Sequence, residues 1–528
     1  MHPSDLASPD RPVEALSLPD PARRRFLSQS LAVGSAIGFA GMLAGLIGEA
    51  KAAPGDPMPF SRAMLLDEAR KRAGEAYQEP KFDLPERFAN LTYEQYRDIR
   101  FKLNRFLWRG ENRGFQVSLL HTGFIYKQPV DIFVVDEGQA REILFDREMF
   151  DYGQSVKPPD DKVDLSFSGL KVRRPLNSDR WEEFAMFQGA TFFRALARGQ
   201  IYGVSARGLA INTGDERGEE FAFFERFWIE RPEPNANSVV IHAFLDSKSC
   251  TGVYRFTLRP GDETVLDVEL TLFPRVDLDH VGIGALTSMF LYDGTSRTRF
   301  DDLRPAVHGS DGLAIVTGLG EHLFRPLANP RNLQISAFVD QSPRAFGLVQ
   351  RRQEFGEFED LEARYDLKPS CWVESIGDWG AGAVQLLEVP SESEIHENII
   401  CYWRPKQKLP AKQEFSAAYR LHYGRNSPPA GELGSVAATR SGQGSNPAFR
   451  RFLIDFEGKM PPAGAVKAEA TSSAGRIVNL VLKPNPVRGG YRVLFELDPR
   501  NAPLVELRVL LNDGSKPVSE TWLYRWTA

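Results

Sequence analysis

The stretch "TGVYRFTLRPGDETVLDVELTLFP", residues 251–274, holds two apolar runs joined by a short turn. β-Branched and aromatic residues fill both runs, and Pro260, Gly261 and Asp262 lie between them. Such runs suit a pleated sheet, and proline, glycine and aspartate favour the turn between two strands. The stretch therefore predicts an antiparallel hairpin.

Similar short runs lie on both sides of this hairpin. They include "VDIFVVD" (130–136) and "SVVIHAFLD" (238–246) before it, and "LQISAFV" (333–339) and "RAFGLVQRR" (344–352) after it. Their density predicts a mainly β protein built around a large antiparallel β-sandwich. Helical spacing of apolar residues predicts two helices near the start, over 61–80 with Ser61 as the cap and over 92–104.

A segment rich in proline, glycine and serine, "GRNSPPAGELGS" (424–435), interrupts the pattern of strands. Beyond it, short strand-like runs such as "RRFLIDFEG" and "GGYRVLFELDP" recur up to residue 528. Several strands in so short a segment are typical of an immunoglobulin-like sandwich. We therefore expect a large β-domain over 57–424 and a small immunoglobulin-like β-domain over 436–528.

The first 52 residues have the order of a targeting segment. "RRRFLSQSL" (23–31) carries a twin-arginine pattern, an apolar stretch follows it, and Ala50-Lys51-Ala52 forms a small-x-small cleavage site. This order predicts a signal peptide over 1–52 and export to the periplasm by the twin-arginine translocase. No later stretch approaches the ~18 consecutive apolar residues of a membrane span, so we expect no stable membrane anchor.

Composition and motifs exclude several kinds of function. The net charge of −5 and the lack of a basic segment argue against a nucleic-acid partner. The three cysteines cannot all pair, and their apolar surroundings predict buried free thiols. "HENII" (396–400) lacks the second histidine of a zinc helix, and no nucleotide-binding motif occurs, so we expect neither a metal nor a cofactor. "GVSARG" (203–208) has the form of a glycine-flanked turn and not of a nucleophile elbow.

Carboxylates and aromatic residues are dense between residues 290 and 404. Cleavage of a glycosidic bond typically uses two carboxyl groups, and aromatic faces stack on sugar rings. For any single residue the plainer interpretation is stronger, because aspartate and glycine punctuate turns while tryptophan and tyrosine fill sandwich cores. Alternation along 397–404 places Glu397, Ile399, Cys401 and Trp403 on one face of a strand, with Glu397 at its entry.

Long blocks of this sequence resemble the periplasmic glucan biosynthesis protein family OpgG/OpgD, also called MdoG/MdoD. The resemblance covers essentially the whole chain after residue 52, and the twin-arginine segment is more similar to the OpgD branch. The blocks are "YGVSARGLAINT" (202–213), "AFLDSKSCTGVYRF" (243–256), "LTSMF" (286–290), "RPAVHGSDGL" (304–313), "RPLANP" (325–330), "KPSCWVESIGDWGAG" (368–382), "ENIICYWRP" (397–405) and "SETWLYRW" (519–526).

The resemblance implies a galactose mutarotase-like β-sandwich followed by an immunoglobulin-like domain. It also implies action on osmoregulated periplasmic glucans, whose backbone is β-1,2-linked, by an inverting glycoside hydrolase or transglycosylase. The family's general acid, an aspartate, falls on Glu397. A second family aspartate, on the base side, falls on Gly309, and Tyr365 matches a tyrosine near the catalytic water or hydroxyl chain.

The candidate site comprises a catalytic group and a glucan-binding group of residues. The expected catalytic residues are Glu397, Tyr365, and Asp378 or Asp311 in place of the missing carboxylate, with Asp301 as a third substitute. The residues expected to bind glucan are Trp372, Trp379, Arg304, His308, Asp301 and Trp403.

Gly309 leaves three outcomes open: a substitute carboxylate, transfer to a sugar hydroxyl in place of water, or binding without catalysis. The rival function is therefore a non-catalytic glucan-binding or assembly factor. A mutarotase-like epimerase is disfavoured, because no convincing His/Glu pair occurs beyond His308 or His396. The sequence does not set the oligomeric state, and a homodimer is among the options.

Overall fold

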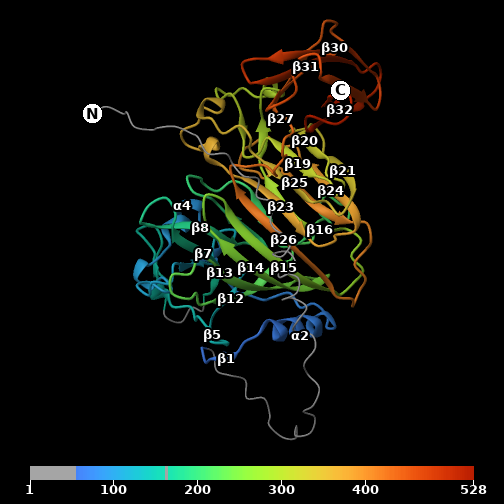
Figure 1. Cartoon of the computed structure of the whole chain (residues 1–528). Coiled ribbons are helices and arrows are strands. Elements are labelled where there is room, and N and C mark those ends of the chain that lie inside the picture. Colours follow the sequence, from blue (N-terminus) through green and yellow to red (C-terminus); the bar gives the residue numbers. More distant parts are fainter. Residues whose placement is uncertain (1–54, 161–164) are drawn as a thin grey trace, which may run out of the picture. The chain divides into compact units, whose positions relative to one another are not determined.

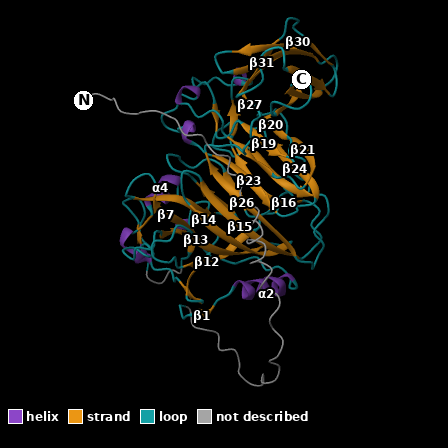
Figure 2. Cartoon of the chain, viewed as in Figure 1, coloured by secondary structure: helices purple, strands orange, loops and turns teal. Residues whose placement is uncertain are grey.

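The computed structural model describes residues 55–160 and 165–528, so the expected signal peptide lies outside the described residues. Strands account for most of the described secondary structure (Figure 2). Within that part of the chain, no helix is both long and apolar enough to cross a membrane. The prediction of a mainly β protein built from sandwiches is confirmed.

The larger sheet has fifteen strands, and its central strands lie side by side in Figure 1. Their spatial order is β1 (Met58–Pro59), β5 (Gln139–Glu142), β4 (Asp131–Asp136), β12 (Phe223–Glu230), β13 (Val239–Asp246), β14 (Cys250–Arg259), β15 (Thr264–Pro274), β26 (Phe415–Gly424), β23 (Ser370–Ile376), β22 (Ala345–Val349), β19 (Gly312–Val316), β20 (His322–Pro326), β33 (Thr521–Thr527), β32 (Leu504–Asn512) and β29 (Lys467–Ser472). Two neighbouring pairs, β4 with β12 and β20 with β33, are parallel.

The second sheet has ten strands and carries the candidate site. Its order is β21 (Gln334–Gln341), β24 (Ala381–Glu388), β25 (Ile399–Pro405), β16 (Val281–Ser288), β10 (Ser205–Arg207), β9 (Phe192–Ala195), β8 (Trp181–Gln188), β7 (Phe167–Pro175) and β3 (Gln116–His121), and β11 (Ala210–Ile211) also pairs with β16.

Smaller elements complete the fold. Short sheets pair β17 (Phe290–Tyr292) with β18 (Val307–His308) and β2 (Arg100–Phe101) with β6 (Phe150–Asp151). A four-stranded sheet has the order β27 (Ser435–Gln443), β28 (Arg450–Glu457), β31 (Gly490–Asp498) and β30 (Arg476–Asn485). The helices are α2 (Arg62–Ala73), α3 (Glu86–Ala89) and α4 (Tyr93–Asp98), with 3₁₀ turns η1 (Leu103–Arg105), η2 (Arg147–Met149), η3 (Arg297–Arg299), η4 (Phe355–Glu357) and η5 (Tyr365–Leu367).

The expected hairpin is formed by β14 and β15, which pair antiparallel from Cys250 and Pro274 to Arg259 and Val265. One large core joins the two main sheets, and it takes alternate residues of their strands. In β25, Ile399, Cys401 and Trp403 belong to this core, whereas Tyr402 lies in a separate cluster on the other face. The predicted alternation is therefore confirmed for residues 399–403, as are the three buried free cysteines. Glu397 does not follow it, because it lies before β25 and bonds to Thr287 on the other face of the sheet.

Both expected helices begin where predicted and end early. Ser61 caps α2 by accepting a hydrogen bond from the Met64 amide, and Thr92 and Gln95 form a capping box on α4. Helix α2 stops at Ala73, and α4 stops at Asp98 because Arg100 and Phe101 pair with β6 instead. Pairing with a distant strand overrides local helical spacing here.

The C-terminal strands form a sandwich with its own core. Phe452, Phe495 and Trp522 pack together between the four-stranded sheet and strands β32 and β33. Strand β33 also pairs in parallel with β20, so the fifteen-stranded sheet continues into the C-terminal residues. The position of the domain boundary stays a prediction.

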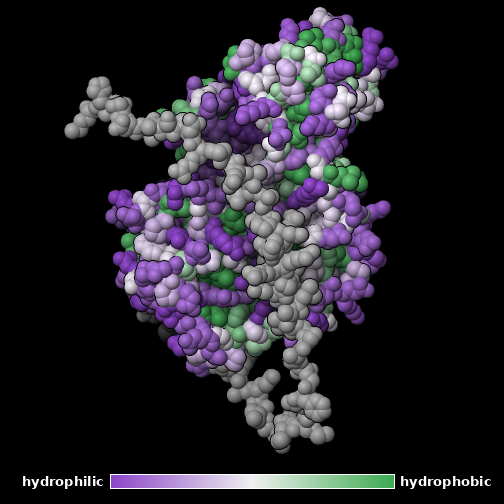
Figure 3. Space-filling view, viewed as in Figure 1, coloured by the Kyte–Doolittle hydropathy of each residue, from purple (hydrophilic) through white to green (hydrophobic). Residues whose placement is uncertain are grey.

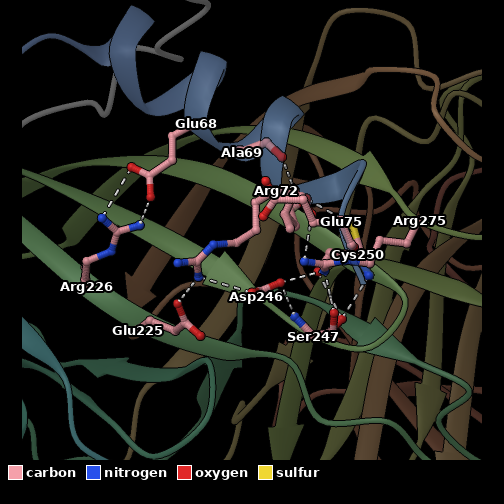
Figure 4. Close-up of polar contacts among 11 residues, drawn as sticks. Glu68, Ala69, Arg72, Glu75, Glu225, Arg226, Asp246, Ser247, Cys250 and Arg275 are labelled. Carbon is pink, nitrogen blue, oxygen red and sulfur yellow. Dashed lines mark hydrogen bonds and ion pairs between the residues drawn. The ribbon is translucent and has the colours of Figure 1, made fainter. Parts of the chain in front are cut away.

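Helix α2 is fastened to the larger sheet by ion pairs (Figure 4). Arg72 lies 2.5 Å from Glu225 and 3.2 Å from Asp246, and Asp246 also accepts a hydrogen bond from Arg275 at 2.6 Å. Asp246 is buried, and paired arginines offset the cost of burying its charge. The described part of the face shown in Figure 3 is mainly hydrophilic, with hydrophobic residues in small groups.

Candidate functional site

Glu397 lies just before β25 and is held by three donors from three other strands. Its Oε1 accepts hydrogen bonds from Arg194 of β9 at 3.0 Å and from Ser205 of β10 at 2.7 Å. Its Oε2 accepts a hydrogen bond from Thr287 of β16 at 2.6 Å. The side chain keeps 29% of its surface exposed, so the carboxylate is oriented and still within reach of a ligand.

These donors place Glu397 on the outer face of the ten-stranded sheet. Phe193, Ala206 and Leu286, which are sequence neighbours of Arg194, Ser205 and Thr287, all belong to the main core. Because successive strand residues point to opposite faces, the three donors point away from that core. "GVSARG" is thus not a turn at its centre, since Ser205 to Arg207 form strand β10.

A second carboxylate comes from the same loop, residues 389–398 between β24 and β25. Glu394 lies 2.8 Å from Arg304 and accepts a hydrogen bond from the Tyr365 hydroxyl at 3.1 Å. Burial, reinforced by the Glu394 carboxylate, raises the pKa of Tyr365 well above its ordinary value. The phenol therefore stays protonated at neutral pH and is able to relay a proton without forming a phenolate.

The amine of Lys368 interacts electrostatically with both carboxylates, Glu394 and Glu397. Burial lowers its pKa to about 8, although Glu394 and Glu397 act in the opposite direction. Its Nζ lies 4.1 Å from the centre of the Tyr365 ring. At neutral pH most of this amine remains an ammonium group, and it adds a positive charge beside Tyr365.

The lowered pKa makes a prediction about stability. Between pH 8 and about 10.4 the unfolded chain binds more protons at Lys368 than the folded chain does, so its contribution to stability rises with pH. Below pH 8 the full burial cost is present. We expect Lys368→Met to raise the free energy of unfolding at pH 7 by up to about 3 kcal/mol, an advantage that shrinks from pH 8 towards 10.

Urea unfolding at pH 7, 8 and 9.5 measures this effect. Lys157→Met, at an exposed position, is the control, and we expect it to change stability by less than about 0.5 kcal/mol at each pH. A Lys368→Met protein that is less stable than the parent by the same amount at every pH would contradict the prediction.

Gly309 is buried beside this lysine. A Cβ atom built on Gly309 would lie 3.7 Å from Cδ of Lys368 and 3.2 Å from Oγ of Ser288. A side chain at this position would therefore begin beside the aliphatic part of Lys368. The carboxylate that the resemblance places here is absent, and the Lys368 side chain borders the space it would occupy.

His308 and Asp311 belong to a buried polar network. His308 is fully buried, and its two ring nitrogens contact Gln350 at 2.9 Å and Arg352 at 3.0 Å. Asp311 accepts hydrogen bonds from the backbone amides of Arg351 and Arg352, and burial raises its pKa. Neither side chain is exposed, so a glucan could not touch them without rearrangement.

Asp378 and Trp379 lie away from Glu397. Strands β24 and β25 pair from Gly382 and Pro405 at one end to Glu388 and Ile399 at the other, a length of about 20 Å. Asp378 precedes the first end and is bonded to Ser342, whereas Glu397 precedes the second. Asp378 is therefore too distant to replace the missing carboxylate.

The tryptophans expected to bind sugar have structural positions instead. Trp403 is only 1% exposed within the main core, and Trp379 packs against it. Trp372 alternates with core residues of β23, so it faces outward from the fifteen-stranded sheet, where it stacks on His422 with ring centres 3.7 Å apart. The core thus separates Trp372 from Glu397, and Asp301 is exposed.

Of the expected residues, the structure brings Tyr365 and Arg304 together, because both contact Glu394. Glu397 lies on the same loop as Glu394. The sequence interpretation missed Glu394, Arg194, Ser205, Thr287 and Lys368. Three of these, Ser205, Thr287 and Lys368, lie inside the blocks 202–213, 286–290 and 368–382. The sequence signal for these three residues was their place in those blocks. Only the order of the strands in the sheet shows that the blocks come together in space.

Comparisons with known proteins agree on one family. The family described as "Periplasmic glucan biosynthesis protein, MdoG" matches residues 60–526. A relative from Rhodopseudomonas palustris (strain BisA53), named "Glucans biosynthesis protein G", is 48% identical over 479 residues, which are 90% of this chain and 95% of the relative.

Two further relatives carry the same name. The protein from Bradyrhizobium diazoefficiens is 44% identical over 96% of this chain and 99% of its own length. The protein from Vibrio cholerae serotype O1 (strain O395) is 46% identical over 89% of this chain and 87% of its own length. These names belong to the G branch, so the closer similarity to the OpgD branch stays a prediction.

Proposed function

This chain belongs to the periplasmic glucan biosynthesis protein family. We propose that it acts in the periplasm on a β-1,2-linked glucan and cleaves the glucan backbone with Glu397 as a catalytic residue. The observation that carries this proposal is the 389–398 loop, which presents two carboxylates with different partners. Paired carboxyl groups are the usual equipment for breaking a glycosidic bond. Export through the twin-arginine translocase and a homodimeric state remain predictions.

Glu397 is the proton donor in this proposal. Arg194 and Ser205 both donate to Oε1, which leaves Oε2 as the oxygen that carries the proton. The Thr287 hydroxyl is both a donor and an acceptor, so it turns to accept when Oε2 is protonated. The Oε2 proton then passes to the glycosidic oxygen as the bond to C1 breaks.

Tyr365 and Glu394 take up the proton on the other side of the bond. An attacking hydroxyl gives its proton to the Tyr365 oxygen, while the Tyr365 proton moves to Glu394 over 3.1 Å. The new bond to C1 forms on the face opposite the leaving oxygen, which inverts the anomeric configuration. Arg304 holds Glu394 as an ionised acceptor.

The nucleophile in this scheme is water or a sugar hydroxyl. Gly309 removes the carboxylate that the resemblance places near the attacking group, and the ammonium of Lys368 is a poor base below its pKa of about 8. A sugar hydroxyl bound next to Tyr365 is already held in position for attack, whereas free water is not. It therefore needs less activation than water does. These features favour transfer over hydrolysis.

The test follows the products of the purified protein with linear β-1,2-glucan between pH 5 and 8. Hydrolysis creates new reducing ends, whereas transfer changes the chain lengths or produces rings without new ends. Reducing-end assays and mass spectrometry distinguish the two, and we expect the chain-length distribution to change. If neither quantity changes at any pH, the protein is not a glucan-cleaving enzyme.

The second candidate is a glucan-binding or assembly factor without catalysis. Gly309 is the observation that favours it, since an incomplete site still binds. This function predicts tight binding of β-1,2-glucan with unaltered product, and no effect of Glu397→Gln on delivery of glucan to a partner enzyme.

A further inference from the structure

A wide groove lies on the C-terminal side of the candidate site and takes no part in the proposed cleavage. Its volume is about 890 Å³, within the range of known ligand sites. One wall comes from residues 295–299 and 328–334, and the other from residues 441–450 and 524–528. The end of the chain lies beside β32 in Figure 1.

The lining of this groove is positively charged. Four arginines border it, Arg299, Arg331, Arg450 and Arg525, and among the described lining residues there is no aspartate or glutamate. A concave surface with charges of one sign concentrates ions of the opposite sign.

The arginines differ in how far they are already neutralised. Arg525 lies 2.6 Å from Glu506, which is outside the lining, so its charge is partly compensated. Arg450 donates to the Ser441 hydroxyl at 2.8 Å, and it has no ion pair with any residue that the structure describes. Arg331 is exposed and has no hydrogen bond or ion pair within the described residues. Arg331 and Arg450 are therefore the strongest candidates for binding an anion.

The uncharged part of the lining suits a sugar. Trp526 and Phe449, both half-buried, border the groove, and an aromatic face packs against the C–H face of a sugar ring. Gln334 and Gln443 add amide donors and acceptors for hydroxyl groups. Aromatic faces, amides and guanidinium groups together match a carbohydrate that carries negative charge.

The groove is also tied to the loop that carries the two carboxylates. Asn329, one of its lining residues, donates from its side chain to the Ser391 carbonyl at 2.8 Å and accepts from the Ser391 amide at 3.0 Å. Ser391 belongs to the 389–398 loop, which also bears Glu394 and Glu397. Asn329 therefore connects the wall of the groove to that loop.

We propose that this groove is a binding site for anionic carbohydrate, so that the protein recognises glucan chains carrying negatively charged substituents. The carbohydrate part rests on the proposed function, and the anionic part rests on the arginines alone. Guanidinium groups bind sulfate, phosphate and carboxylate groups alike, in each case by paired N–H donors.

The experiment measures the binding of three probes by calorimetry at fixed ionic strength: a sulfated β-1,2-glucan oligosaccharide, the unmodified oligosaccharide of equal length, and inorganic polyphosphate. We expect the sulfated oligosaccharide to bind at least about 10 times more tightly than the unmodified one. The Arg331→Ala/Arg450→Ala protein should lose about that factor for the sulfated probe. Arg141→Ala/Arg180→Ala removes the same charge at exposed positions elsewhere and should leave the affinity unchanged.

The other outcomes of this experiment also test the proposal. Equal affinity for the sulfated and unmodified probes, or an unchanged affinity in the groove variant, would overturn the proposal. Equal affinity for polyphosphate would refute the carbohydrate assignment and leave a general anion site. If the sulfated probe binds as expected but linear β-1,2-glucan is neither bound nor altered, the groove stands and the proposed cleavage fails.

Discussion

Replacing Glu397 by glutamine is expected to lower kcat on β-1,2-glucan by about 10²–10⁴-fold, the usual contribution of a general acid. Glutamine has nearly the same shape but carries no transferable proton. Its carbonyl oxygen still accepts from Arg194 and Ser205, and its amide nitrogen donates to the Thr287 hydroxyl, which turns to accept. Glucan affinity should therefore change far less than kcat, and both are measured on the purified variant.

Two further variants make this result specific. Glu392→Gln alters an exposed glutamate of the same loop and should keep kcat within about twofold of the parent. Glu397→Asp restores the residue that the resemblance places at this position, and it should retain measurable activity. Full activity in Glu397→Gln, with thermal stability unchanged, would remove Glu397 from the mechanism.

Replacing Glu388 by alanine is expected to destabilise the fold by about 3–5 kcal/mol, the range for breaking a buried ion pair from one side. Glu388 and Arg325 are 0% and 2% exposed, and they lie 3.1 Å apart between the ten-stranded sheet and β20. Glu388 also accepts a hydrogen bond from the Ala328 amide at 2.7 Å. Alanine would leave the buried Arg325 charge without its carboxylate and the Ala328 amide without its acceptor.

Urea unfolding measures the loss, and a surface pair supplies the comparison. Arg198 and Asp262 lie 3.0 Å apart with 57% and 85% of their side chains exposed, so Asp262→Ala should cost less than about 1 kcal/mol. A cost below about 1 kcal/mol for Glu388→Ala as well would mean that Arg325 reaches water when its partner is lost.

The local sequence pattern was sufficient to predict the secondary-structure elements and the buried residues of the core. The alternation along residues 251–274 and 399–404 predicts strands, and it also predicts which side chains are buried, because a strand shows every second residue to the core. The early ends of α2 and α4 could not be predicted in the same way. Arg100 and Phe101 join β6, which lies some fifty residues away, and nothing local announces that pairing.

At the candidate site, the contributions of the sequence and of the tertiary structure differ more clearly. The resemblance between blocks of sequence singles out Glu397, Gly309 and Tyr365, since it depends only on residues in order along the chain. Whether a carboxylate lies near Glu397 is a different question. Asp378 and Glu394 are both close to it in sequence, yet one lies about 20 Å along the β24–β25 hairpin and the other lies on the same loop.

By itself, then, the sequence determined the β class, the hairpins, the buried thiols and the family. The tertiary structure decided which side chains meet. Arg194, Ser205 and Thr287 reach Glu397 because β9, β10, β16 and β25 are neighbours in one sheet, and Trp372 is excluded because the core lies between the two sheets. Strand order depends on contacts between residues far apart in the chain, and a site assembled across four strands exists only once that order is formed.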